Sequence, residues 1–194
     1  MLRDYDQDGI SDLFGHSNEQ SAPTSVKAFK GKFENGKLAF DRILFDSLDY
    51  LHYFDTEGLT RTIEISEPDY PAFDDMDGDG DLDILTFDLA GSHVYLFRNL
   101  SQEQGFGNEQ LIFELADDCW GRFLEDMTSP DLILSNDIDE CAQGLVGDEA
   151  EDRNVLHPGS TLLTFDADNN GKKDLVLGDI ASQHLTLLLE NGTD

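Results

Sequence analysis

The sequence is poor in positive charge, and it has no long apolar run. Twelve Lys and Arg residues stand against 42 Asp and Glu residues, so the 194-residue chain carries a formal net charge of −30. Long-range repulsion therefore opposes binding to phosphate backbones and to anionic membrane surfaces. The sequence has no stretch of 18 or more apolar residues, the length needed to span a bilayer, and its first residues form no signal-peptide core. We expect no nucleic-acid partner, no membrane insertion, and an export signal only outside this stretch.

The motifs of common catalytic sites are also missing. There is no G-x-S-x-G elbow, no H-E-x-x-H helix and no phosphate-binding glycine loop, and the five histidines show no ligand spacing. Because the chain has 42 Asp and Glu residues, pairs of carboxylates suited to glycoside hydrolysis are expected by chance and do not indicate an enzyme. The sequence therefore predicts a protein that is not an enzyme.

Only two cysteines are present, Cys119 and Cys141. They lie too far apart for a CxxC redox or zinc arrangement. In an oxidising compartment they are candidates for a disulfide, and the alternative is two buried free thiols.

What the sequence does contain is one acidic pattern that occurs three times, D-x-D-x-[DN]-G-x-x-D-[LI]. We name its occurrences loop 1 (residues 4–12), loop 2 (75–83) and loop 3 (166–174). Carboxylates at positions 1, 3 and 5 converge only if the chain curls around one point, and glycine at position 6 permits that turn. Together with the backbone carbonyl of position 7 and the Asp at position 9, they offer the six or seven hard oxygens that Ca²⁺ prefers.

The pattern therefore predicts about three calcium sites. Asn170 removes one charge from loop 3, so we expect loop 3 to bind more weakly than the others. The predicted ligands are Asp4, Asp6, Asp8, Ile10 and Asp12 in loop 1; Asp75, Asp77, Asp79, Asp81 and Asp83 in loop 2; and Asp166, Asp168, Asn170, Lys172 and Asp174 in loop 3.

An EF-hand begins with the same letters, but it needs an acidic residue at position 12 and a flanking helix on each side. Position 12 is Gly15, Thr86 and Leu177 in the three loops. None of the three loops therefore fits the EF-hand pattern.

Short apolar runs with β-branched and aromatic residues follow each loop. They cover residues 13–14, 84–87 and 175–177, then 26–29, 94–97 and 185–189, and in two units also 37–40 and 110–113. Turn residues bound these runs, which favours strands. The sequence predicts an all-β fold of four-stranded antiparallel sheets with a calcium loop between the first two strands, the form of β-propeller blades.

We expect a single propeller region over residues 1–194, with blades near 1–66, 67–116 and 159–194. Insertions are expected near 46–60 and 115–158, and residues 117–158 form either an insertion or a degenerate blade. Closed propellers have about four to eight blades. The chain is therefore expected to be an incomplete propeller or part of a larger one, completed by further blades or domains of the parent chain or by a partner subunit.

The loops and their strands resemble the FG-GAP or VCBS-like repeats of integrin-type propellers, and residues 72–99 match that pattern best. The resemblance implies a non-catalytic calcium-binding module of a secreted or cell-surface protein of bacterial origin, which mediates adhesion to a protein or carbohydrate ligand. The alternatives are an accessory propeller of a polysaccharide-degrading enzyme and a structural spacer in a surface or secretion assembly. Trp120, Tyr50 and Phe54 are either a sugar platform or core residues.

Overall fold

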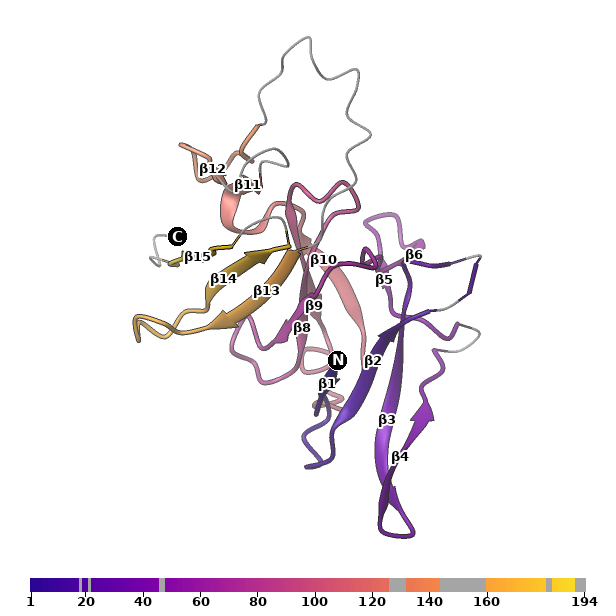
Figure 1. The fold of residues 1–194 in the computed structure, drawn as a ribbon. Coiled ribbons are helices and arrows are strands. Elements are labelled where there is room, and N and C mark those ends of the chain that lie inside the picture. Colours follow the sequence, from indigo (N-terminus) through magenta and orange to yellow (C-terminus); the bar gives the residue numbers. More distant parts are fainter. Residues whose placement is uncertain are drawn as a thin grey trace. The chain divides into compact units, whose positions relative to one another are not determined.

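The computed structural model describes residues 1–17, 19–20, 22–45, 48–125, 132–143, 160–180 and 183–190. Within these ranges the fold is all-β, as predicted, with several antiparallel sheets and none closed into a barrel (Figure 1). No helix in the described ranges is long and apolar enough to cross a membrane. The chain divides into a first unit (residues 1–67, 73–84 and 97–115) and a second unit (residues 68–72, 85–96 and 116–194).

The N-terminal sheet is a four-stranded antiparallel meander in the order β1-β2-β3-β4. Its strands are β1 (Leu2–Arg3), β2 (Asp12–His16), β3 (Val26–Glu34) and β4 (Lys37–Arg42). Asn35 and Gly36 join β3 to β4, and both have positive φ (51° and 75°), as a tight hairpin turn requires. The runs predicted at 13–14, 26–29 and 37–40 all lie in strands of this meander.

A second sheet has the strand order β6-β5-β10-β9-β8-β7. Its strands are β7 (Ala72–Asp74), β8 (Asp83–Phe87), β9 (Val94–Asn99), β10 (Phe113–Asp117), β5 (His52–Phe54) and β6 (Thr60–Thr62). Every residue of β8 is buried, including the polar Asp83 and Thr86 at its start and near its end. The strand β5 lies in the stretch near 46–60 that was expected to be an insertion, β6 begins where that stretch ends, and β5 pairs in parallel with β10.

One predicted strand is misplaced. The run at 110–113 was expected to be the outer strand of this unit, but β10 begins only at Phe113. The Asn99 side chain explains the shift, because its amide oxygen accepts the Ile112 N–H (2.9 Å) while its amide nitrogen donates to the Gln110 carbonyl (3.2 Å). The Ile112 N–H and the Gln110 carbonyl are thus bonded to a side chain, although the Ile112 carbonyl still accepts the Leu100 N–H (2.7 Å).

The C-terminal sheet contains β13 (Ser160–Phe165), β14 (Asp174–Asp179) and β15 (Leu185–Leu188) in that order, all antiparallel. β11 (Phe123–Glu125) and β12 (Leu132–Leu134) form a separate antiparallel pair that follows the short 3-10 turn η1 (Trp120–Arg122). Both strands of this pair lie in the predicted insertion or degenerate blade at 117–158, of which residues 126–131 and 144–158 are outside the described residues.

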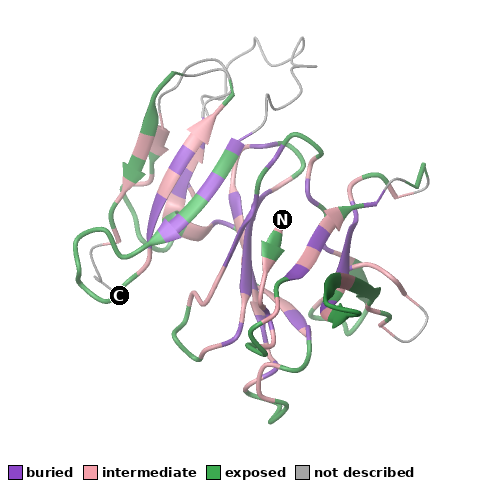
Figure 2. Cartoon of the chain, turned by 60° about the horizontal axis from the view of Figure 1, so that its bottom comes forward, coloured by how far each residue is buried: buried purple, intermediate pink, exposed green. Residues whose placement is uncertain are grey.

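Buried side chains lie along the strands, whereas the loop tips are exposed (Figure 2). In the first unit the rings of Phe14 and Phe73 pack at a centroid distance of 4.7 Å. In the second unit β13 alternates strictly between buried and exposed residues, so one face of this strand meets a core. Cys119 and Cys141 form a disulfide, with Cα atoms 5.9 Å apart.

Candidate metal centres

Each acidic loop joins the first two strands of its sheet. Loop 1 connects β1 to β2, loop 2 connects β7 to β8, and loop 3 connects β13 to β14. The three loops are therefore equivalent in topology as well as in sequence, and their hydrogen bonds can be compared position by position.

At position 1 both carboxylate oxygens accept backbone N–H groups from within the loop. In loop 1, Asp4 accepts from Asp8 (3.1 Å) and Gly9 (2.9 Å). Asp166 accepts the equivalent bonds from Asn170 (3.0 Å) and Gly171 (2.9 Å). In loop 2, Asp75 accepts from Gly80 at the same position 6 (3.1 Å), but its other bond comes from Gly78 at position 4 (2.7 Å) rather than from position 5. These bonds curl each loop around its first carboxylate.

Positions 3 and 5 share a hydrogen bond of shorter sequence separation, in which the side-chain oxygen accepts the N–H two residues later. Asp77 accepts from Asp79 (3.2 Å), and Asp79 accepts from Asp81 (3.0 Å). The same bonds occur at Asp6 and Asp8 in loop 1 and at Asp168 and Asn170 in loop 3. One oxygen of each side chain is thereby oriented, and the asparagine fits because it keeps that oxygen.

The loop backbone enters the left-handed region twice. Glycine at position 6 has φ of 86°, 101° and 84° in loops 1, 2 and 3 (Gly9, Gly80 and Gly171), which agrees with the reason given for that glycine. Position 4 is also left-handed, with φ of 58°, 86° and 64° (Gln7, Gly78 and Asn169). Position 4 is variable in the pattern, but Gly78 and Asn169 are of residue types that favour this conformation and so were a usable signal.

The aspartate at position 9 is buried and ties its loop to the sheet. Asp83, which is 1% exposed, accepts the N–H of Met76 and the N–H of Asn99 in β9, both at 2.8 Å. In the same way, Asp12 accepts the N–H groups of Tyr5 (2.9 Å) and Gly31 (2.7 Å). Asp174 accepts those of Ala167 (2.6 Å) and Glu190 (2.8 Å). Position 9 therefore has a structural role in addition to the predicted role as a ligand.

The side chains of each loop converge. Three carboxylate oxygens lie within 4.8 Å of one another in each loop: those of Asp4, Asp6 and Asp8; of Asp75, Asp77 and Asp83; and of Asp166, Asp168 and Asp174. Loop 2 has a second such cluster, formed by Asp77, Asp79 and Glu103. Glu103 follows β9 rather than the loop, and no sequence signal pointed to it.

Loop 2 also contains a buried carboxylate oxygen that lacks a hydrogen-bond partner among the described residues. Asp81 is 1% exposed; its Oδ2 accepts the Gln102 N–H (3.1 Å), and its Oδ1 is the orphaned atom. Burial, together with the charges of Asp79 and Glu103, raises the pKa of Asp81 to about 6. A buried oxygen in this state is stabilised by a cation, so the residues of loop 2 fit a divalent metal ion.

The position-9 aspartates differ in their electrostatics. Burial raises the pKa of Asp83 to about 7, and burial also raises the pKa of Asp12. The N–H groups of Glu190 and Ala167 instead lower the pKa of Asp174. In the absence of a cation, ionising the position-9 aspartate is therefore least favourable in loop 2.

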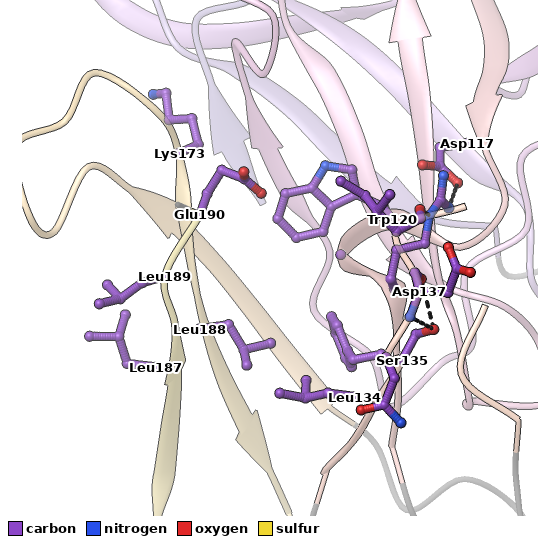
Figure 3. Close-up of a pocket in the computed structure, with 15 residues that line it drawn as sticks. Asp117, Trp120, Leu134, Ser135, Asp137, Lys173, Leu187, Leu188, Leu189 and Glu190 are labelled. Atoms are coloured by element: carbon purple, nitrogen blue, oxygen red, sulfur yellow. Dashed lines mark hydrogen bonds and ion pairs between the residues drawn. The ribbon is translucent and has the colours of Figure 1, made fainter. Parts of the chain in front are cut away.

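Away from the loops, the second unit contains a pocket of about 730 Å³ (Figure 3). The half-buried Trp120 lines it together with apolar side chains and with acidic groups that include Asp117, Asp137 and Glu190. Of the other aromatic candidates, Tyr50 is half-buried and Phe54 is 51% exposed. The exposure of Phe54 speaks against a core role for that ring, whereas both alternatives stay open for the half-buried Trp120 and Tyr50.

No protein-family model, no curated protein and no solved structure matches the chain.

Proposed function

We propose that the chain is a non-catalytic, calcium-binding part of a β-propeller from a secreted or cell-surface protein, of the FG-GAP or VCBS-like kind. The observation that carries the proposal is the hydrogen-bond network of the loops. Its bonds at positions 3, 5 and 9 recur in all three loops, and each loop lies between the first two strands of its meander. Each loop also gathers three carboxylate oxygens, from positions 1, 3 and 5 in loop 1 and from positions 1, 3 and 9 in loops 2 and 3, which supports a cation as the common ligand.

The meanders support the propeller part of the proposal. β1–β4 form a four-stranded sheet, β7–β10 are four consecutive strands of the six-stranded sheet that β5 and β6 extend, and β13–β15 supply three strands of a third meander. Four-stranded antiparallel sheets in series are the repeating unit of propellers, which close with about four to eight of them. In this proposal the remaining blades belong to the parent chain or to a partner subunit.

Calcium would be held by the carboxylates of positions 1, 3, 5 and 9, by the asparagine at position 5 of loop 3 and by the carbonyl of position 7. Its contribution there is charge neutralisation, which lets each acidic turn close in a chain of net charge −30. At millimolar free calcium, a site with a Kd of ~0.1 mM adds about 1.4 kcal/mol of stability. The ions thus stiffen the loops and take no part in a reaction.

Calorimetric titration of the metal-free protein tests the calcium part. We expect binding of about three Ca²⁺ ions and a higher melting temperature in calcium than in chelator, with little response to Mg²⁺. Absence of both the binding heat and the shift would refute the calcium proposal.

The Trp120 pocket favours a binding module over a simple spacer, because a spacer has no use for a concave site with an aromatic wall and convergent polar groups. A planar indole with carboxylate and amide neighbours suits a sugar ring or a peptide side chain. The calcium-loaded protein should therefore bind members of a glycan or peptide panel without turnover. Trp120→Ala should abolish this binding, whereas Phe106→Ala, which removes an exposed aromatic ring outside the pocket, should not.

Turnover of a bound glycan would favour the polysaccharide-degrading alternative. Binding that Trp120→Ala leaves unchanged would move the ligand site elsewhere, and no binding at all would leave the spacer as the better description.

A further inference from the structure

The three loops differ in a residue that lies outside their shared sequence pattern. This residue belongs to the third strand of each meander, or directly follows it, and lies beside the loop. In each meander one residue of that region gives its N–H to the buried aspartate of position 9: Gly31, Asn99 and Glu190 for loops 1, 2 and 3. The residue immediately before it is Lys30, Arg98 and Leu189, respectively. These three side chains hold equivalent places, and their charges differ.

In loop 1 this position brings an ammonium group to the carboxylate cluster. Lys30 Nζ forms an ion pair with Asp6 Oδ2 and lies 3.9 Å from Asp8 Oδ2. Asp6 and Asp8 are two of the three clustered carboxylates of this loop, and the Asp6 side chain is only 4% exposed. A positive charge of the protein itself therefore already sits against the predicted ligands of positions 3 and 5.

Loop 2 has a weaker version of the same contact. Arg98 Nη1 lies 3.8 Å from Asp77 Oδ2, but the guanidinium is held more closely by Glu114, which accepts bonds from Nη2 (2.6 Å) and Nε (3.1 Å). Glu114 thus neutralises much of the charge that Arg98 would otherwise bring to the loop.

Loop 3 has no cation at this place, because Leu189 occupies it. Among the described residues, Asp166 and Asp168 accept hydrogen bonds only from N–H groups of the loop itself. Their cluster lacks the ion pair that the cluster of loop 1 has.

From this comparison we infer that the Lys30 ammonium is a built-in counter-ion of loop 1, so that a divalent cation must displace it and loop 1 is the weakest of the three sites. This inference rests on the proposed calcium function. It reverses the order expected from the sequence, in which Asn170 made loop 3 the weakest. It also implies that loop 1 stays closed at calcium concentrations that leave its metal site empty, since Lys30 supplies part of the neutralising charge.

The chain offers a matched pair of variants for the test. Lys30→Met removes the counter-ion, and Lys32→Met removes a charge of similar exposure from the same strand, where Lys32 pairs with Asp41 (2.7 Å) rather than with a loop. Both variants change the net charge equally, so a difference between them reports the local contact. Lys30→Gln serves as a second variant should the methionine perturb folding.

Tyr5 provides a readout specific to loop 1. It occupies position 2, which is Met76 in loop 2 and Ala167 in loop 3, so luminescence of Tb³⁺ that is lost in Tyr5→Phe reports the ion bound at loop 1. We expect Lys30→Met to tighten Tb³⁺ binding at loop 1 about five- to tenfold and Ca²⁺ to compete accordingly, whereas Lys32→Met should stay close to wild type. Leu189→Lys should weaken one Ca²⁺ step in calorimetry without changing the Tyr5 signal.

The inference is overturned if Lys30→Met and Lys30→Gln bind no more tightly than Lys32→Met while the other loops still bind Ca²⁺. That result would leave the calcium proposal intact. If neither the wild type nor any variant binds Ca²⁺ or Tb³⁺, the calcium proposal fails and the inference fails with it.

Discussion

Replacing the buried aspartate of loop 2 separates the structural role of position 9 from metal binding. Asp83→Ala leaves the N–H groups of Met76 and Asn99 without their acceptor, and hydrogen bonds to a charged group are worth about 1.5–3 kcal/mol each. Burial raises the pKa of Asp83 to about 7, so the cost of ionising it offsets part of that gain. We therefore expect the metal-free protein to lose about 2–4 kcal/mol of unfolding free energy.

Urea denaturation in chelator, followed by circular dichroism, measures this loss, and Asp79→Ala is the matched control. Asp79 is exposed and accepts one N–H, from Asp81, so its removal should cost less than about 1 kcal/mol in chelator. In calcium, both variants should lose the stabilisation contributed by loop 2. The reasoning is wrong if Asp83→Ala matches wild type in chelator, or if Asp79→Ala is equally destabilised there.

The remaining predictions concern pH and the close approach of β3 to loop 1. Burial raises the pKa values of Asp81 and Asp83 to about 6 and about 7, so the metal-free folded chain keeps protons that the unfolded chain releases above about pH 4. Its unfolding free energy should therefore fall as pH rises from about 4 to about 7, and urea midpoints that rise over this window would contradict the assignment. A Cβ at Gly31 would lie 2.2 Å from the Ser11 carbonyl oxygen, so Gly31→Ala should cost about 2 kcal/mol or more. Gly15→Ala has open space and should change stability by less than about 0.5 kcal/mol, and similar melting temperatures for the two variants would refute the steric argument.

Much of the local structure could be predicted because it depends on short-range patterns. Alternate acidic residues around a glycine define each loop, and the apolar runs after them define strands, so the all-β prediction is confirmed. All eight expected runs overlap strands, the run at 110–113 only at Phe113. The misplaced run at 110–113 shows the limit of this reasoning. Its apolar character was read correctly, but bonds from the Asn99 side chain, 11 to 13 residues earlier, set where β10 begins.

The parts of the candidate sites that were missed depend on register between distant segments. Lys30 and Glu103 reach their loops only because the third strand and the turn after it fold back beside the loop. Asp81 was predicted to contribute its carbonyl, and only its burial reveals the side-chain oxygen that lacks a partner among the described residues. Contacts of this kind leave no periodic trace in a sequence.

A crystal structure grown in calcium, with anomalous scattering recorded to locate the ions, tests the central claim most directly. We expect an anomalous peak in each acidic loop, with oxygen ligands at about 2.3–2.6 Å and the lowest occupancy in loop 1. Loops 2 and 3 without a bound ion in calcium-saturated crystals would contradict it.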